Sequence, residues 1–407
     1  MPSTLNLQAL SGSVDVRGPG ALYPSAQGNL TLLAADNVGL SQQVYTLQYG
    51  GTSAYNLGLI DASADALPSA LTPYGVNGSS NFFALWHLGY LSGIAPTMLH
   101  SADPLHAADS QPVRIYALQG DVLDGIQAPN GFQYRSLQVL PNKPALIYAG
   151  RDIVNLSFVG QQLRDADVTR ISAGRDIYDT PITAYFNNNT SRTDPGAYQL
   201  VPALLLGGPG TFLIEAGRNI GPLSSQQEIA TTGSSLLTGD IRYTGIDTIG
   251  NAINPYLPHE SADVDVLFGV SPGIAVNSFM ASYVDGTTNG VNLMPDLVTF
   301  MERREAGQVV DTGYAQDKIT VSLTSDQARQ LFNQQPDYVQ RQFVTEAVFK
   351  ILAQVGADYN NPASPYYGQY ARGYTAVDTL FPAAYGYTAN GSGQGGHQRC
   401  GEDRGYG

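Results

Sequence analysis

The chain has 407 residues, of which only 13% are charged, and its formal net charge is −14 at pH 7. This acidic balance disfavours binding to nucleic acid or to an anionic membrane surface. The single cysteine, Cys400, excludes an internal disulfide framework, and without a run of eighteen apolar residues the sequence predicts no membrane-spanning helix.

The N-terminal region carries short alternating runs that begin with glycine, over residues 12–16, 28–32 and 120–123. Alternation with a period of two places Val14 and Val16 on one face of a strand and Asp15 on the other. We therefore predict short stacked strands over residues 1–258. The first residues lack the basic and apolar regions of a signal peptide, so we expect an internal or truncated piece of a longer protein.

An aromatic stretch interrupts this pattern between about residues 40 and 110, and we predict an insertion folded onto the main body. It contains the run SSNFFALWHLGYLSG. Its aromatic side chains are predicted to form the core of the insertion, with a sugar-stacking platform as the alternative. They are Phe82, Phe83, Trp86 and Tyr90.

A pentapeptide recurs in the next region. The sequence AGRDI at residues 149–153 returns 24 residues later at 173–177, and as AGRNI a further 43 residues on at 216–220. A unit of this length cannot close a core alone, but stacked units bury a continuous one. The longer interval is consistent with one rung plus a polar excursion over residues 187–196. The structural repeat residues are Gly150, Arg151, Asp152, Ile153, Gly174, Arg175, Asp176, Ile177, Gly217, Arg218, Asn219 and Ile220.

Each place in the pentapeptide has a predicted role. The glycine allows a positive φ at a corner, and the isoleucine points inward in a column of equivalent side chains. Stacking would otherwise bring like charges together. We therefore expect each arginine to reach a carboxylate or carbonyl of an adjoining rung, and Asn219 to relieve one negative charge.

After about residue 258 the spacing becomes helical, and we predict a small helical module over residues 259–360. Thr324 and Gln327 have the spacing of a capping box. The segment 336–356 begins with proline and places five apolar residues on one helical face: Val339, Phe343, Ala347, Ile351 and Val355. Residues 361–388 are expected to return to the β-rich body, and 389–407 to form a disordered or out-of-frame tail.

The repeated pentapeptides, with the run LRDADVTRISAGRDI at residues 163–177, resemble the haemagglutinin-type repeats of the filamentous-haemagglutinin family of exoproteins. Residues 263–382 resemble a region near the C-terminal part of some such exoproteins. The resemblance implies a mainly β fold, a right-handed parallel β-helix, with a small α-helical module toward the C-terminus. It also implies export by a two-partner outer-membrane transporter to the cell surface, although no export signal stands in this sequence.

Candidates for catalysis are few. Asp165 and Asp167 could share a strand face as paired carboxylates, or face solvent as ordinary rung residues. Asp263 and Asp265 could bind calcium through oxygen ligands, but no glycine-centred loop with further acidic residues follows. The glycine-rich run at residues 207–212 lacks the lysine of a phosphate-binding loop and is predicted to be a turn.

The histidines His87, His100, His106, His259 and His397 show no metal-ligand spacing, and no G-x-S-x-G motif is present. We predict no catalytic, metal-binding or cofactor-binding residues. The predicted function is a structural, adhesive segment of a secreted exoprotein that binds a cell-surface receptor or glycan. The alternatives are a carbohydrate-active β-helix enzyme, a polysaccharide hydrolase or lyase, and the stem of a contact-dependent toxin-delivery protein.

Overall fold

The computed structural model describes residues 2–18, 20–43, 56–59, 100–124, 134–180, 203–223, 245–252, 254–269, 273–306 and 321–383. The chain divides into two compact units. The first consists of Met1–Gly269 with Arg303–Val321, and the second of Val270–Glu302 with Ser322–Gly407. None of the helices in the described ranges has the length and apolarity needed to span a lipid bilayer.

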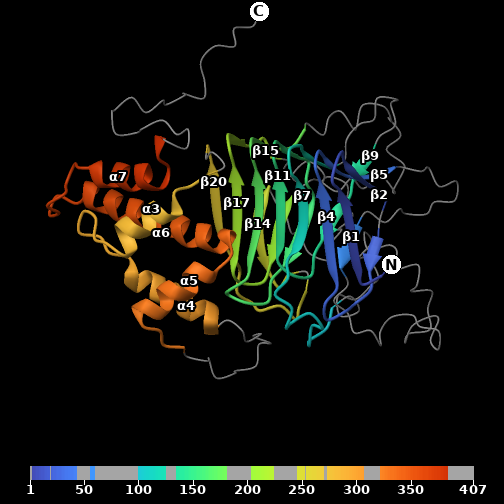
Figure 1. Cartoon of the computed structure of the whole chain (residues 1–407), viewed down its shortest axis with the longest axis horizontal. Coiled ribbons are helices and arrows are strands. Elements are labelled where there is room, and N and C mark those ends of the chain that lie inside the picture. The colour runs from blue at the N-terminus through green and yellow to red at the C-terminus, as the bar shows by residue number, and fades with distance from the viewer. Residues whose placement is uncertain are drawn as a thin grey trace, which may run out of the picture. The chain divides into compact units, whose positions relative to one another are not determined.

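The first unit is built from three sheets (Figure 1). The first sheet, drawn from blue to yellow across Figure 1, has its strands in chain order. They are β1 (Thr4–Ala9), β4 (Asn29–Ala34), β7 (Val113–Ala117), β11 (Ala145–Ala149), β14 (Val168–Ala173), β17 (Thr211–Ala216) and β20 (Asp263–Phe268).

The other two sheets have the same kind of order. The second contains β2 (Val14–Arg17), β5 (Val38–Gln43), β8 (Val122–Asp124), β12 (Ile153–Val154), β15 (Asp176–Tyr178) and β18 (Asn219–Ile220). The third contains β3 (Gly20–Leu22), β6 (Asn56–Leu59), β10 (Gln138–Leu140), β13 (Phe158–Gln161), β16 (Leu204–Gly207) and β19 (Ile246–Gly250).

The chain supplies strands to the three sheets in rotation, so β1, β2 and β3 are followed by β4, β5 and β6. We call each such set of three strands a rung. Neighbouring rungs pair in parallel, and the one antiparallel partner among the described strands is β9 (Tyr134–Ser136), which pairs with β5. The prediction of stacked short strands is confirmed at this level: the unit is mainly parallel β.

Alternation along the strands builds the core of this unit. In the first sheet, in-register pairing aligns one aliphatic side chain from each of five successive rungs in a single buried column. This column contains Leu32, Ile115, Ile147, Ile171 and Ile214, none of them more than 1% exposed. Burying one such side chain stabilises the fold by about 1.5–3 kcal/mol, so each added rung extends a continuous core.

The second unit is helical. Its elements are α3 (Val276–Phe279), which continues as a π-helix over Met280–Val284, α4 (Met294–Ala306) as far as Glu302, α5 (Ser325–Gln334), α6 (Asp337–Asn360) and α7 (Ala371–Leu380). The predicted capping box is confirmed, because Thr324 and Gln327 exchange both bonds at the start of α5. The predicted apolar face of α6 is also confirmed: Phe343, Ile351 and Val355 lie buried in one cluster.

Three predicted boundaries differ from the structure. Strand β20 still belongs to the first sheet, so the helical module begins after residue 268 rather than at residue 259. Residues 371–380 form α7 and bury Ala376 and Leu380 in the helical core, so the expected return of 361–388 to the β-rich body is wrong. The stretch taken as an insertion includes two sheet strands, β5 at its start and β6 at residues 56–59. The tail, 389–407, lies outside the described residues.

Candidate functional site at the repeated corners

The pentapeptides form equivalent corners between the first and second sheets. In the second sheet Ile153 pairs with Ile177, and Ile177 pairs with Ile220. All three side chains belong to the core of the first unit or pack against it. The predicted inward column of isoleucines is therefore confirmed.

A ladder of side-chain oxygens runs through these corners. In each step, a side-chain oxygen accepts the backbone N–H of the equivalent residue one rung later, at 2.9–3.2 Å. The residues in order are Ser13, Asn37, Asp121, Asp152, Asp176 and Asn219, and we call this set the corner ladder. It ties six successive rungs together, three more than the pentapeptide itself marks.

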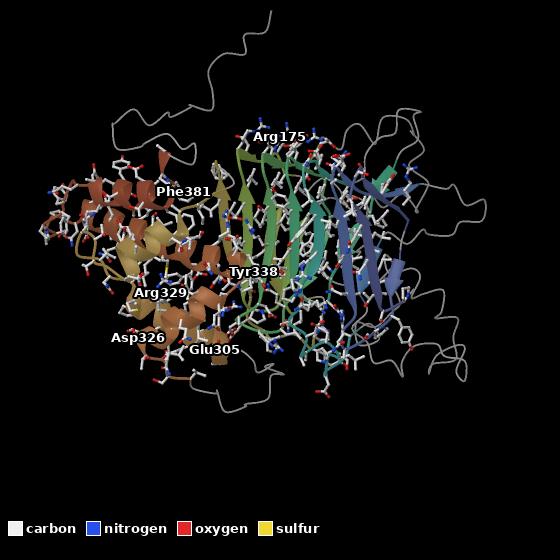
Figure 2. The ribbon with its side chains drawn as sticks, viewed as in Figure 1. Arg175, Glu305, Asp326, Arg329, Tyr338 and Phe381 are labelled. Atoms are coloured by element: carbon white, nitrogen blue, oxygen red, sulfur yellow. The ribbon has the colours of Figure 1, made fainter. Side chains whose placement is uncertain are left out.

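The arginines add charge pairing to the ladder. Arg151 binds Asp121 at 2.8 Å, and Arg175 binds both oxygens of Asp152, at 3.0 and 2.5 Å. Figure 2 labels Arg175 on this row. Arg218 likewise pairs with Asp176. Each arginine thus reaches the carboxylate of the preceding rung, as predicted. Positive and negative groups then alternate along the row.

This pairing has an electrostatic signature. The hydrogen bond to Asp152 is the largest influence on Arg175 and raises the pKa of its guanidinium. Asn219 donates its side-chain N–H to Asp176 at 3.0 Å, in addition to the ladder bond from its backbone. As an uncharged residue it ends the run of carboxylates, consistent with the predicted relief of one negative charge.

The predicted reason for the glycines is wrong. None of Gly150, Gly174 and Gly217 has a positive φ. Close stacking is the reason instead: a Cβ on Gly174 would collide with the carbonyl oxygen of Gly150, and one on Gly150 would collide with that of Leu118. The rungs approach so closely at this corner that only hydrogen fits at these two positions.

A second set of polar side chains lies at the next corner, between the second and third sheets. Asp124 is fully buried and accepts the backbone N–H groups of Leu137 at 2.7 Å and Ser157 at 3.1 Å. Asn155 accepts the backbone N–H of Thr180 at 2.7 Å. Sequence reasoning missed this set, although its signal was present: each member stands three residues after a corner-ladder aspartate.

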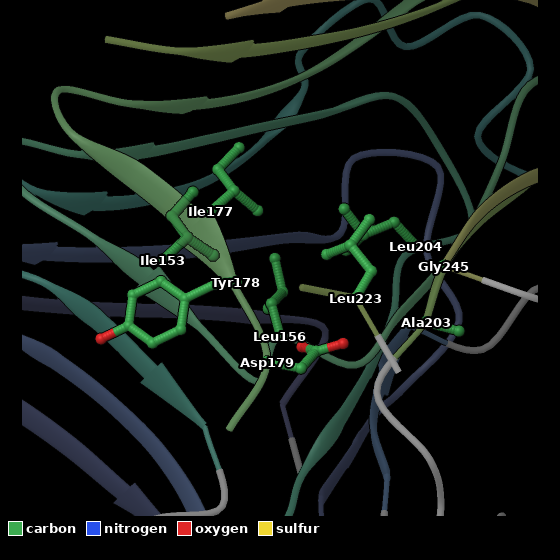
Figure 3. A pocket seen from close by; sticks show the side chains of 9 residues that line it. All are labelled: Ile153, Leu156, Ile177, Tyr178, Asp179, Ala203, Leu204, Leu223 and Gly245. Carbon is green, nitrogen blue, oxygen red and sulfur yellow. The ribbon is translucent and has the colours of Figure 1, made fainter. Parts of the chain in front are cut away.

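A small, partly open pocket adjoins this second corner (Figure 3). Aliphatic side chains dominate its lining, and the polar ones are Tyr178 and Asp179.

The candidate carboxylates Asp165 and Asp167 do not share a strand face. Asp165 and Asp167 lie in a turn before β14 rather than on a strand face, and Asp165 is exposed. Asp167 accepts the backbone N–H groups of Leu163 at 3.0 Å and Arg164 at 3.2 Å. Burial raises the pKa of Asp167, and these two bonds oppose that effect. Its position is that of a residue that holds a turn.

The other candidate pair of carboxylates, Asp263 and Asp265, lies on strand β20. Asp263 and Asp265 are two residues apart on the last strand of the first sheet. Burial raises the pKa of Asp265 to about 6, and the negative charge of Asp263 adds to the effect. Within the described ranges, no three His, Cys, Asp or Glu side chains gather as metal ligands around this pair or elsewhere.

The other candidates have structural surroundings or lie outside the described residues. The glycine-rich run is a turn between β16 and β17, where Gly208 and Gly210 have positive φ. His106 is buried with Nδ1 3.4 Å from the side-chain nitrogen of Asn142, and Nδ1 of His259 lies 2.8 Å from that of Asn251. The aromatic candidates Phe82, Phe83, Trp86 and Tyr90, with His87, His397 and the excursion 187–196, are not among the described residues.

One buried ion pair was not foreseen. Lys143 is 1% exposed and donates to Asp109 at 2.7 Å. Burial by itself raises the pKa of Asp109, but the bond from Lys143 and the neighbouring charges outweigh it, so the pKa is lowered overall. The pair fixes the segment that precedes β7 to the turn before β11.

The fold and this site together define a mainly parallel β protein whose repeated charged residues connect successive rungs. Comparison with protein-family models, curated protein sequences and solved structures found no match for the chain.

Proposed function

We propose that the chain is a structural, adhesive segment of a large secreted surface exoprotein, and that its rungs wind as a right-handed parallel β-helix. The observation that carries the proposal is the corner ladder. Its side-chain oxygens accept backbone N–H groups from the next rung, and its aspartates pair with the arginines beside them, which suits a scaffold that extends a surface. The resemblance of the pentapeptides to filamentous-haemagglutinin repeats points in the same direction.

The partners follow from this role. During export the chain would pass through an outer-membrane transporter of a two-partner system, and on the surface it would bind a receptor or glycan of a host or neighbouring cell. Adhesion is favoured over glycan cleavage because Asp167 holds a turn while Asp165 faces solvent. In a glycosidase, by contrast, both carboxylates flank the scissile bond.

The test combines attachment and turnover. Purified chain is assayed for saturable attachment to cultured epithelial cells and to bacteria, and for release of products from neutral and acidic polysaccharides. We expect saturable attachment without turnover. Reproducible cleavage that disappears in the Asp165→Asn/Asp167→Asn double variant would overturn the proposal in favour of an enzyme, and so would a lack of attachment to every surface.

A further inference from the structure

The helical unit exposes a cluster of tyrosines where α6 joins α7. Four of them, Tyr359, Tyr366, Tyr367 and Tyr374, are between 38% and 57% exposed. The fifth, Tyr370, is partly buried and packs against the helical core. All five come from one stretch of sixteen residues at 359–374, and we call them the tyrosine surface. Exposed aromatic side chains gathered in this way mark a binding site more often than scattered ones do.

The rings are held in place by one another. Tyr370 meets Tyr359 edge-on at 6.3 Å between ring centroids, and it meets Tyr374 edge-on at 5.4 Å. Tyr370 thus links the end of α6 to the first turns of α7, two helices that lie side by side in Figure 1.

Tyr366 is supported from one side. The guanidinium of Arg372 lies 3.5 Å from the centre of its ring, and Asp358 holds that guanidinium at 2.8 Å. A cation on one face of the ring fixes its orientation. Tyr366 remains 38% exposed, so a ligand can stack on it at little cost in side-chain ordering.

The connecting loop is ordered by its own hydrogen bonds. Ser364 donates its hydroxyl to Asp358 at 3.2 Å and accepts the backbone N–H of Tyr366 at the same distance. The backbone N–H of Gly368 donates to the carbonyl of Tyr359 at 3.1 Å. These hydrogen bonds join the loop to the end of α6 and to itself.

The charge of this surface restricts its ligand. Within the stretch 359–374 the only charged side chain is Arg372, which pairs with Asp358, and Asp378 follows Tyr374 by one turn of α7. No cluster of like charges is present in this stretch to attract an anionic or cationic polymer. Asparagine, serine and glutamine accompany the tyrosines, a composition that supplies apolar ring faces together with uncharged hydrogen-bonding groups.

We infer that the tyrosine surface binds an uncharged glycan chain, whose sugar rings stack on Tyr366 and Tyr367 while their hydroxyl groups bond to the neighbouring amides. A sugar ring has an apolar C–H face and a hydroxyl edge, which match these two kinds of group. The cation already beneath Tyr366 disfavours a second cation on its open face. This inference names the ligand class of the proposed adhesive function and rests on it.

The experiment measures binding of the full chain to neutral hexasaccharides of glucose, mannose and N-acetylglucosamine, with hexagalacturonate as the acidic counterpart. We expect calorimetry to detect at least one neutral hexasaccharide. Tyr366→Ala and Tyr367→Ala should each weaken that binding by about tenfold or more, a typical loss for a stacked ring. Tyr366→Phe should retain it, because the ring remains.

Tyr23→Ala is the matched control, since the exposure of Tyr23 lies between those of Tyr366 and Tyr367 but Tyr23 belongs to the first unit, and it should change nothing. Circular dichroism checks that each variant is folded. The inference is overturned if no neutral hexasaccharide binds, if only hexagalacturonate binds, or if the Tyr366 and Tyr367 variants bind as the parent does. Cell attachment without neutral-glycan binding would contradict this inference and leave the proposed adhesive function supported. Neutral-glycan binding without cell attachment would contradict the adhesive function and leave the glycan-binding site supported.

Discussion

At the scale of single residues, the repeated pentapeptide combines three kinds of contact between neighbouring rungs. Isoleucine extends the core, the aspartate accepts a backbone N–H and a guanidinium, and the glycine allows the two corners to approach. The arginine partners could be predicted because a column of like charges is unfavourable. The role of the glycine could not, since a sequence does not distinguish a glycine needed for its φ from one needed for close approach.

The close approach at Gly174 makes a direct prediction. Gly174→Ala should destabilise the chain by about 1–3 kcal/mol, because the added methyl group must displace the backbone of Gly150. Gly356→Ala is the matched control in α6, where nothing lies within 4 Å of the added carbon. It should be neutral or stabilise by up to about 1 kcal/mol. Urea unfolding measures both, and equal effects would refute close packing at the corner.

Asp265 predicts a pH dependence of stability. Its pKa is about 6 in the folded chain against 3.8 for an ordinary aspartate. The folded state therefore holds the proton more tightly, so stability should fall as the pH rises from about 4 to about 6 and then level off. Asp265→Asn should remove this fall and stabilise the chain by about 1 kcal/mol at neutral pH, allowing for solvent screening.

Urea unfolding at several pH values tests this prediction, and NMR titration of Asp265 gives its pKa independently. Asp263→Asn is the companion variant, because loss of the neighbouring charge should lower the pKa of Asp265. A variant Asp265→Asn whose stability still falls across the same pH range would show that another group titrates there.

At the scale of elements, helix α6 shows which buried residues a periodic apolar pattern predicts and which it does not. The apolar spacing predicted the buried face that contains Phe343 and Ile351. Lys350 of the same helix is exposed and pairs with Asp296. The pattern did not predict that Gln342 and Thr345 are buried as well. Polar side chains buried by tertiary packing leave no periodic signal, because their environment is set by parts of the chain remote in sequence.

Phe343 provides the test of this helix. Its ring meets Phe300 at 5.2 Å and Phe332 at 5.4 Å, so it joins α4, α5 and α6. Phe343→Ala should cost about 3–5 kcal/mol, as expected for a large buried side chain. Phe349→Ala, at a 40% exposed position of the same helix, should cost less than about 1 kcal/mol. Comparable losses in thermal or urea unfolding would mean that the buried face is misassigned.

The sequence predicted that the first unit consists of short stacked strands, but it did not predict every strand. Alternating residues and the pentapeptides located the rungs between β7 and β18, where the signal is strongest. The sequence did not predict strand β6, because its four residues lie inside an aromatic stretch. It did not predict α7, because the segment before that helix is rich in tyrosine and proline. Pairing with neighbouring rungs, rather than local preference, makes β6 a strand.

At the scale of the whole molecule, the corner ladder and the aliphatic column repeat along one direction, so each rung serves as the template for the next. Stability in such a protein is a sum of contacts between neighbouring rungs. This arrangement suits the proposed adhesive role, because the chain can lengthen its surface by adding rungs without a new core. The tyrosine surface, carried by the helical unit, would then supply the selective contact.

The central claim is that successive pentapeptide rungs stack in register, and engineered disulfide formation tests it most directly. Tyr148 pairs with Ser172 on adjacent rungs, and parallel neighbours about 4.8 Å apart lie within reach of a disulfide. In a Cys400→Ser background, Tyr148→Cys/Ser172→Cys should form an intramolecular bond rapidly under mild oxidation, detected by mass spectrometry of the digested protein. The control Tyr148→Cys/Asp165→Cys places the second thiol in the exposed turn and should stay reduced. Cross-linking of the control pair alone would contradict the stacked rungs and, with them, the proposed β-helix.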